Sequence, residues 1–320
     1  MDIRSLLATG KNIWLSTHIS SDGDGLGSEI AFYHALKSKN INARIIHNDK
    51  ASERYAFLLD GVEILDAIQL DTDLLTKDDI IFIFDTHDPK LCTPLFEKLQ
   101  AKGTRIVFID HHMTVKQELE NVVYHIDENA SCTGELVFAL IKELAIKADK
   151  NIATALYTSL LFDTQSFKNM HEPVKVLDMA QELLLAGADH KKIHRHLFEN
   201  WTLSKFNYLS KLITQVTYKN NEVALISITK ADLKEFNLIA DDVSDIVDMF
   251  MSLKILVVSI VIREEDQNFY KLSFRSRDYE ILSWAREFGG GGHLRSAGAW
   301  VHDSYDHILA KINAQIKARG

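Results

Sequence analysis

The stretch of sequence that most constrains the fold is residues 104–112, TRIVFIDHH. Its apolar, β-branched centre predicts a buried strand, and the three residues after it are all ionisable. Asp110, His111 and His112 are costly to bury in an apolar core, but carboxylate and imidazole groups are good metal ligands. The sequence therefore predicts a strand that delivers metal-binding groups at its carboxyl end.

Two more apolar segments, residues 12–17 (NIWLST) and 79–84 (DIIFIF), are predicted strands that end in the same way. The acids and imidazoles that follow them are His18, Asp22 and Asp24 after the first strand, and Asp85, His87 and Asp88 after the second. Ligands of open α/β sheets bind beyond the carboxyl ends of the parallel strands. We therefore expect these side chains to point at one place.

Strand-like and helix-like segments alternate through the first part of the chain, which predicts an α/β fold with a doubly wound, mostly parallel sheet over residues 1–189. Within it, residues 49–77 are expected to form loop and helix. An amphipathic linker helix is predicted over residues 190–215. Residues 216–320 then form a smaller α/β domain with a mixed sheet. Its expected elements are strands at 223–228, 255–263 and 270–275 and a helix at 243–251.

The composition excludes several classes of protein. The formal charge of −9, from 36 Lys and Arg against 45 Asp and Glu, argues against a protein that coats long nucleic acid. A small phosphorylated substrate remains compatible, because bound cations would reverse the local charge. No apolar run approaches the ~20 residues that cross a bilayer, and no signal peptide is recognisable. With Cys92 and Cys132 as its only cysteines, the chain is expected to be cytoplasmic, without disulfides.

The candidate ligands together are enough for two adjacent metal sites with carboxylate and imidazole ligands. Taken singly, His18 could be a hydrogen-bonded strand-end histidine and Asp22-Gly-Asp24 a turn. Asp163, after an apolar helix at residues 152–162, could be a solvated helix terminus. Its charge opposes the helix dipole there, however, so it needs a partner such as a cation. The ligand mix suits Mn²⁺ or Mg²⁺, with Fe²⁺ or Co²⁺ as alternatives. Two such ions ~3.5–4 Å apart polarise a phosphoryl oxygen and generate hydroxide from water. Asp85, on the middle strand, is the expected bridging ligand.

A second chemical feature is the glycine-rich segment at residues 288–298, FGGGGHLRSAG. Four consecutive glycines commonly mark a flexible turn, and the absence of a following Lys-Ser/Thr excludes a P-loop. Glycines also let a phosphate approach backbone N–H groups, and His293 is a donor beside them. Arg275, Ser276 and Arg277, on a neighbouring predicted strand, could bind the same phosphate.

These motifs resemble a known family. HISSDGDGLGS, FDTHD, IDHH and LLFDTQSF match, in order, the four motifs of the DHH phosphoesterases, and FGGGGHLRSAG after LSFRSR resembles the DHH-associated C-terminal domain. The resemblance covers nearly the whole chain. Within the family, its size and pairing of domains resemble the nanoRNase, oligoribonuclease and pAp-phosphatase group, which is related to RecJ-type exonucleases and to cyclic di-AMP and pApA phosphodiesterases. Arg295 and Ser296 depart from the small residues usual in relatives.

The resemblance implies a role for each candidate residue. One ion would be held by His18, Asp22 and Asp85, and the other by Asp24, Asp85, His111 and Asp163. The implied catalytic residues are Asp85, His112, which touches the scissile phosphate or the attacking water, and Asp110, which orients the histidines. His87 and Asp88 are expected to support the site at most. The implied substrate-binding residues are Arg275, Ser276, Gly291, Gly292 and His293.

The resulting functional hypothesis is a two-metal phosphohydrolase that cleaves very short phosphorylated nucleotides, such as nanoRNA, pApA, pGpG and pAp, to mononucleotides. The expected partner is a short oligonucleotide or dinucleotide, and no association with a membrane is expected. By resemblance to the family, the protein is expected to form a homodimer. The alternatives are a cyclic di-AMP phosphodiesterase and a non-catalytic nucleotide- or RNA-binding module. An inorganic pyrophosphatase lacks the FGGGGH signature, and a long-strand exonuclease is disfavoured by the acidic charge.

Overall fold

The computed structural model describes residues 2–113 and 118–319. Contacts divide the chain into two compact units, residues 1–200 and 201–320. The sequence predicts a separate linker helix over residues 190–215 between the two domains, and the observed division falls inside that segment. In the structure this segment is α7 (His190–Phe198) in the first unit and α8 (Leu203–Gln215) in the second. The single helix is therefore wrong: Glu199 leaves the helical region, and the Thr202 side chain caps a new helix by accepting a hydrogen bond from Lys205 N.

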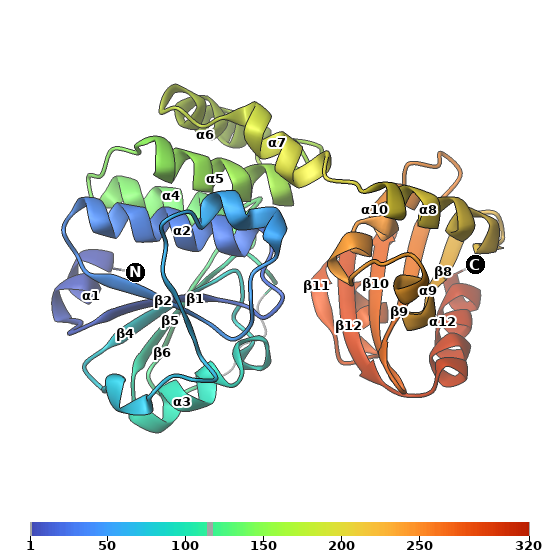
Figure 1. The fold of residues 1–320 in the computed structure, drawn as a ribbon, viewed down its shortest axis with the longest axis horizontal. Coiled ribbons are helices and arrows are strands. Elements are labelled where there is room, and N and C mark those ends of the chain that lie inside the picture. The colour runs from blue at the N-terminus through green and yellow to red at the C-terminus, as the bar shows by residue number, and fades with distance from the viewer. Residues whose placement is uncertain (1, 114–117, 320) are drawn as a thin grey trace. The chain divides into compact units, whose positions relative to one another are not determined.

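Within the described residues, the first unit contains a six-stranded sheet in the order β3-β2-β1-β4-β5-β6 (Figure 1). Its strands are β1 (Ile13–Thr17), β2 (Ala43–His47), β3 (Ile64–Asp66), β4 (Ile80–Phe84), β5 (Arg105–Asp110) and β6 (Val122–Ile126). Each pairing between these strands is parallel. The predicted doubly wound sheet is confirmed. The strand order reverses between β1 and β4, where ligands of such sheets bind.

Both faces of this sheet are covered by helices, which is why its central strands are largely apolar. The helices α2, α4 and α5 cover one face, and α3 covers the other (Figure 1). Alternate strand residues such as Leu15, Phe82 and Ile109 pack in the core of the first face, and intervening residues such as Ile81 and Phe108 pack with α3. The helices are α1 (Ile3–Thr9), α2 (Gly23–Ser38), α3 (Leu95–Lys102), α4 (Thr133–Glu143), α5 (Lys150–Asp163) and α6 (Pro173–Leu185). Short 3₁₀ turns, η1 (Glu53–Leu58), η2 (Thr72–Leu74) and η3 (Pro89–Cys92), complete the unit.

The second unit is built on a mixed sheet, as predicted, in the order β11-β12-β10-β9-β8-β7 over its described residues. Only β8 and β9 pair in parallel within that sheet, and the other described neighbours are antiparallel. The strands are β7 (Thr217–Lys219), β8 (Val223–Ile228), β9 (Val258–Asp266), β10 (Phe269–Ser276), β11 (Gly291–His293) and β12 (Ser296–His302).

The helices of the second unit are α8, α9 (Lys230–Glu235), α10 (Ile246–Phe250), α11 (Leu282–Arg286) and α12 (Tyr305–Arg319). The helix expected at residues 243–251 is shorter than predicted, because a 3₁₀ turn, η4 (Asp241–Val243), precedes α10. Across the described part of the chain, no helix combines the length and the apolar character that a membrane span requires.

Candidate metal centre

The predicted metal ligands come from the carboxyl edge of the parallel sheet and from the helices beside it. His18 follows β1, Asp85 follows β4, and His111 follows β5, so all three lie at the same edge. Asp24 lies in the first turn of α2, and Asp163 is the last residue of α5. Asp22 is the N-cap of α2. The fold therefore brings together residues that are up to 145 positions apart in the sequence, from 18 to 163.

The first group of possible ligands consists of His18, Asp22 and Asp85, whose ligand atoms lie within 4.8 Å of one another. His18 Nε2 is 3.5 Å from Asp85 Oδ2 and 3.9 Å from Asp22 Oδ1. The other ring nitrogen, Nδ1, lies 2.9 Å from the carbonyl oxygen of Ile19, which fixes the ring. Gly25 is needed beside this group, because a Cβ there would lie 2.3 Å from Thr17 Oγ1.

The second group consists of Asp24, His111 and Asp163, whose ligand atoms also lie within 4.8 Å of one another. His111 Nε2 is 3.1 Å from Asp163 Oδ2 and 3.4 Å from Asp24 Oδ2. It is also 3.7 Å from Asp85 Oδ1, whereas the other oxygen of Asp85 faces His18. Asp85 thus lies between the two groups with one oxygen toward each, which is the arrangement that a bridging carboxylate needs.

The backbone of Asp85 adopts an uncommon conformation. Its φ is +63°, in the left-handed region that Asp tolerates better than most residues. The Asp85 N–H nevertheless donates to the carbonyl oxygen of Ile109 at 2.9 Å, which continues the pairing of β4 with β5. Such conformations persist when surrounding structure holds them, and they are common at functional sites.

The electrostatics of the two groups favour a bound cation. Burial, together with the charges of Asp24 and Asp22, raises the pKa of Asp85 well above its usual value. Burial and the charge of Asp163 likewise raise the pKa of Asp24 to about 6. Burial alone would lower the pKa of His111, but Asp163 and Asp24 raise it to about 10. Crowded carboxylates therefore destabilise one another's charged forms.

The donor set fits divalent metal ions. Asp24 and Asp85 are 0% and 5% exposed, and among the described residues their ion pairs are made with imidazoles rather than with Lys or Arg. Imidazole nitrogen and carboxylate oxygen are the ligands of Mn²⁺, Fe²⁺ and Co²⁺ sites. Imidazoles compensate buried negative charge less fully than Lys or Arg, and bound divalent cations would supply the missing positive charge.

Asp110 has different surroundings from the other acids and does not belong to either group. Its Oδ1 accepts hydrogen bonds from the backbone N–H groups of His111 and His112, at 2.8 and 3.1 Å, and lies 2.8 Å from His112 Nδ1. Its Oδ2 lies 2.5 Å from His87 Nδ1. Asp110 therefore lies between the rings of His87 and His112, and the side chain of His112 is one-third exposed.

Two residues that the sequence analysis missed hold the predicted ligands. Thr133, at the start of α4, donates its N–H to Asp24 Oδ2 at 2.8 Å and its hydroxyl to Asp85 Oδ1 at 3.1 Å. Ser159, on α5, donates its hydroxyl to Asp24 Oδ1 at 2.5 Å. A polar residue within the apolar run 152–162 was the available sequence signal for Ser159. For Thr133 the only sequence signal was its position at the start of a helix-like segment.

We expect Thr133→Val to weaken Mn²⁺ binding by about 10–100-fold, because supporting hydrogen bonds to metal ligands typically contribute that much. The variant keeps the backbone donor to Asp24 and the branched shape, but it removes the hydroxyl that holds Asp85. Isothermal titration with Mn²⁺ measures the change. Thr133→Ser, which retains the hydroxyl, is the matched control and should bind Mn²⁺ within about threefold of the wild type. Equal affinities for the Val and Ser variants would contradict this role.

The predicted substrate-binding residues lie on neighbouring strands of the second unit. In the strand register, Ser296 of β12 lies opposite Arg275 of β10 on one side and His293 of β11 on the other. Arg275 Nε donates to Asp248 Oδ1 at 2.8 Å, so its charge is partly compensated by α10. The Ser276 hydroxyl accepts a hydrogen bond from Tyr279 N at 2.7 Å. The structure therefore groups Arg275 and His293, but it also gives Arg275 and Ser276 internal partners.

The glycine-rich segment is not simply a flexible turn, because residues Gly291–His293 form β11 and pair with β12. Gly292 has a φ of +126°, and a Cβ there would lie 2.6 Å from the carbonyl oxygen of Ser296. Strand packing therefore explains Gly292 without any ligand. Gly291 is exposed, and a Cβ there would meet no heavy atom within 4 Å. Of the two glycines, only Gly291 has open space beside it.

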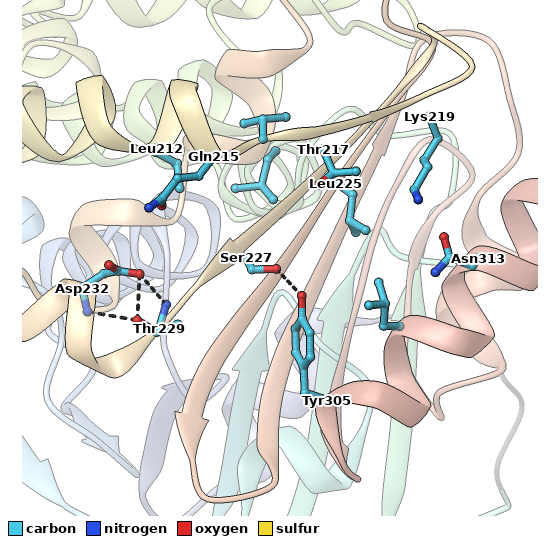
Figure 2. A pocket seen from close by; sticks show the side chains of 13 residues that line it. Leu212, Gln215, Thr217, Lys219, Leu225, Ser227, Thr229, Asp232, Tyr305 and Asn313 are labelled. Atoms are coloured by element: carbon cyan, nitrogen blue, oxygen red, sulfur yellow. Dashed lines mark hydrogen bonds between the residues drawn. The ribbon is translucent and has the colours of Figure 1, made fainter.

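The second unit also contains a cavity of about 440 Å³ between the end of α8, the strands β7 and β8, and α12 (Figure 2). Ser227 and Tyr305 meet in it, with their hydroxyl oxygens 2.7 Å apart. Lys219, Asp232 and Asn313 also line it. Its lining includes none of the predicted substrate-binding residues, all of which are described.

Comparison with known proteins supplies a family context. Residues 12–160 match the model of the DHH family N-terminal domain, and residues 220–318 match that of the DHHA1 domain. The chain is 26% identical over 320 residues to a Geobacillus thermodenitrificans protein named cyclic-di-AMP phosphodiesterase GdpP, but the match covers 94% of this chain and only 46% of that relative. It thus spans about half the length of that protein.

Other relatives match over most of their length. The Thermus thermophilus protein named bifunctional oligoribonuclease and PAP phosphatase NrnA is 25% identical over 314 residues, covering 96% of this chain and 91% of the relative. Among solved structures, an exopolyphosphatase-related protein from Bacteroides fragilis has a TM-score of 0.86 and 25% identity, covering 98% of this chain and 94% of that one.

Proposed function

We propose, from the premise that this chain belongs to the DHH family of hydrolases, that it cleaves phosphoester bonds in very short phosphorylated nucleotides. The proposed substrates are nanoRNA, linear dinucleotides of the pApA and pGpG type, and pAp. The observation that carries the proposal is the convergence of two carboxylate–imidazole groups on Asp85. The relative named as an oligoribonuclease and PAP phosphatase supports the choice of substrates.

In this proposal His18, Asp22 and Asp85 hold one divalent ion, and Asp24, Asp85, His111 and Asp163 hold the other. When bound, the two ions would supply positive charge against the phosphoryl oxygens and lower the pKa of water. We propose Mn²⁺ as the metal and a cytoplasmic homodimer as the working form, on the resemblance to the family. Sedimentation of the purified protein tests the dimer.

The protein side chains then position the reacting groups. Asp110 Oδ1 lies 2.8 Å from Nδ1 of His112 and would hold that ring, and the role proposed for His112 is contact with a phosphoryl oxygen or with the attacking water. The exposed third of the His112 side chain allows that contact. Hydrolysis forms a bond from the water oxygen to phosphorus, breaks the ester P–O bond, and gives the leaving oxygen a proton. Arg275 and His293 would bind the terminal phosphate of the nucleotide.

A substrate panel with added Mn²⁺ tests the proposal. We expect AMP release from pApA and phosphate release from pAp, with much slower turnover of a 20-residue RNA. The relative named as a cyclic-di-AMP phosphodiesterase supports a second candidate function, so cyclic di-AMP belongs in the panel. Faster turnover of cyclic di-AMP than of pApA would favour that candidate. A protein that retains every nucleotide unchanged would be a binding module rather than a hydrolase.

A further inference from the structure

His87 is a partly buried imidazole that the proposed reaction does not yet use. It follows Asp85 by two residues, and its side chain is 12% exposed. The next residue, Asp88, is turned away into η3, where its carboxylate accepts a hydrogen bond from Lys90 N at 3.0 Å. His87 instead points to the end of β5, with its Nδ1 2.5 Å from Asp110 Oδ2.

Two imidazoles therefore share one carboxylate. His112 Nδ1 lies 2.8 Å from Oδ1 of Asp110, and His87 Nδ1 lies 2.5 Å from Oδ2. Asp110 itself is fully buried. The terminal torsion of an Asp side chain is soft. Contacts to both carboxylate oxygens therefore restrict rotation of the carboxylate more than contacts to one oxygen do.

The contact of His87 is not required to join the strands. β4 and β5 are already paired through Phe84 and Ile109, and the Asp85 N–H donates to Ile109 at 2.9 Å. The two rings therefore contact Asp110 as a pair, each within hydrogen-bond distance of a different carboxylate oxygen.

We propose that His87 is a positioning residue, which holds Oδ2 of Asp110 so that Oδ1 keeps the ring of His112 oriented toward the substrate. The inference rests on the proposed function, because it assigns His87 a part in the same reaction. His87 acts through Asp110 and His112, and it has no contact with the substrate in this proposal.

A double-mutant cycle with the full-length protein, Mn²⁺ and pApA tests the pathway. His87→Leu should lower kcat about 10–100-fold with little change in KM, as loss of an orienting hydrogen bond does. In a His112→Ala background the same change should alter kcat less than about twofold, because the ring to be oriented is gone. His87→Asn keeps a side-chain N–H and should recover kcat to within about threefold of the wild type.

The matched control is His47→Leu, which removes another buried imidazole–carboxylate pair. His47 Nε2 lies 2.7 Å from Glu29 Oε2, and neither residue contacts Asp110 in the described structure. We expect this variant to lose stability, with kcat within about twofold of the wild type and no coupling to His112.

Proton NMR of the metal-free protein provides a readout independent of activity. Imidazole Nδ1–H protons that are hydrogen-bonded to a buried carboxylate resonate far downfield, and His87→Leu should remove one such signal and shift that of His112. Equal losses of kcat in both backgrounds, full activity of His87→Leu, or an unshifted His112 proton would overturn the role of His87. A wild-type protein that shows the coupled protons but hydrolyses no nucleotide would overturn the proposed function and leave the shared carboxylate intact.

Discussion

Asp85→Asn should lower kcat on pApA by about 10³-fold or more. The Asp85 side chain is placed to bind both proposed metal ions, so each metal site would lose one negatively charged ligand. The substitution changes the shape very little, and the amide oxygen can still accept the Thr133 hydroxyl. Burial and neighbouring acids raise the pKa of Asp85, so its charged form is destabilised in the metal-free protein. Metal-free Asp85→Asn should therefore be at least as stable as the wild type. Steady-state kinetics with Mn²⁺ and thermal unfolding measure the two effects.

Asp79→Asn is the matched control for this experiment. Asp79 is a fully buried acid at the opposite end of the same strand, where it accepts hydrogen bonds from Asn12 Nδ2 at 2.8 Å and from Thr76 N at 3.0 Å. Its loss should cost about 1–3 kcal/mol of stability, as for other buried hydrogen-bonded groups, and leave kcat and Mn²⁺ affinity close to those of the wild type. A folded, active Asp85→Asn protein would refute the bridging role.

The central strands of the first unit could be predicted because they are buried on both faces. β4 is a continuous apolar run and β1 and β5 are largely apolar, whereas no residue of the outer strands β3 and β6 is fully buried. For this reason residues 49–77, expected to be loop and helix, in fact include β3 as well as the turns η1 and η2. Edge strands gain their pairing from a neighbour, which a single segment of sequence does not reveal.

The grouping of His18, Asp85 and His111 could be predicted because parallel strands all end at one edge of a sheet. The supporting residues could not, because their contacts depend on how helices pack. Asp24 accepts hydrogen bonds from the first N–H groups of α4, and the N-cap of that helix, Cys132, makes no side-chain capping bond. An acid from α2 thus takes the place of the cap of another helix. Nothing in the local sequence of α4 indicates that partner.

His87 shows a further limit of sequence reasoning. In the sequence it is one of two ionisable residues that follow Asp85 closely, and nothing distinguishes His87 from Asp88. The structure separates them, because Asp88 caps η3 and His87 reaches Asp110 on the next strand. The turn geometry that directs one inward and the other outward becomes visible only when β4 and β5 are placed side by side.

Removing divalent metal should abolish hydrolysis and lower the thermal stability of the protein, and the loss of stability should grow as pH rises from 5 to 7.5. The pKa of Asp24 is raised from 3.8 to about 6 in the folded, metal-free protein. A raised folded-state pKa means that this group contributes stability below pH 3.8, and that the contribution is lost as pH rises through about 6. For Asp24 the loss is on the order of 3 kcal/mol, at 1.36 kcal/mol per pKa unit.

Bound Mn²⁺ should reverse that loss, because it binds the ionised carboxylates and therefore competes with protons. Mn²⁺ at about 100 times its Kd adds about 2.7 kcal/mol, which corresponds to roughly 5–10 °C in Tm for units of this size. The measurement is the Tm difference between Mn²⁺-loaded and EDTA-treated protein at pH 5 and pH 7.5. Groups away from the site, such as the buried pair of His47 and Glu29, cancel in this difference.

Asp24→Asn separates the metal site from other sources of pH dependence. The variant lacks the group whose pKa is raised, so its EDTA-treated form should lose less stability between pH 5 and 7.5 than the EDTA-treated wild type. It should also gain little from Mn²⁺, since one ligand of the proposed second site is neutral. If Mn²⁺ stabilises the wild type no more at pH 7.5 than at pH 5, or stabilises Asp24→Asn equally, the buried acids are not where the metal binds.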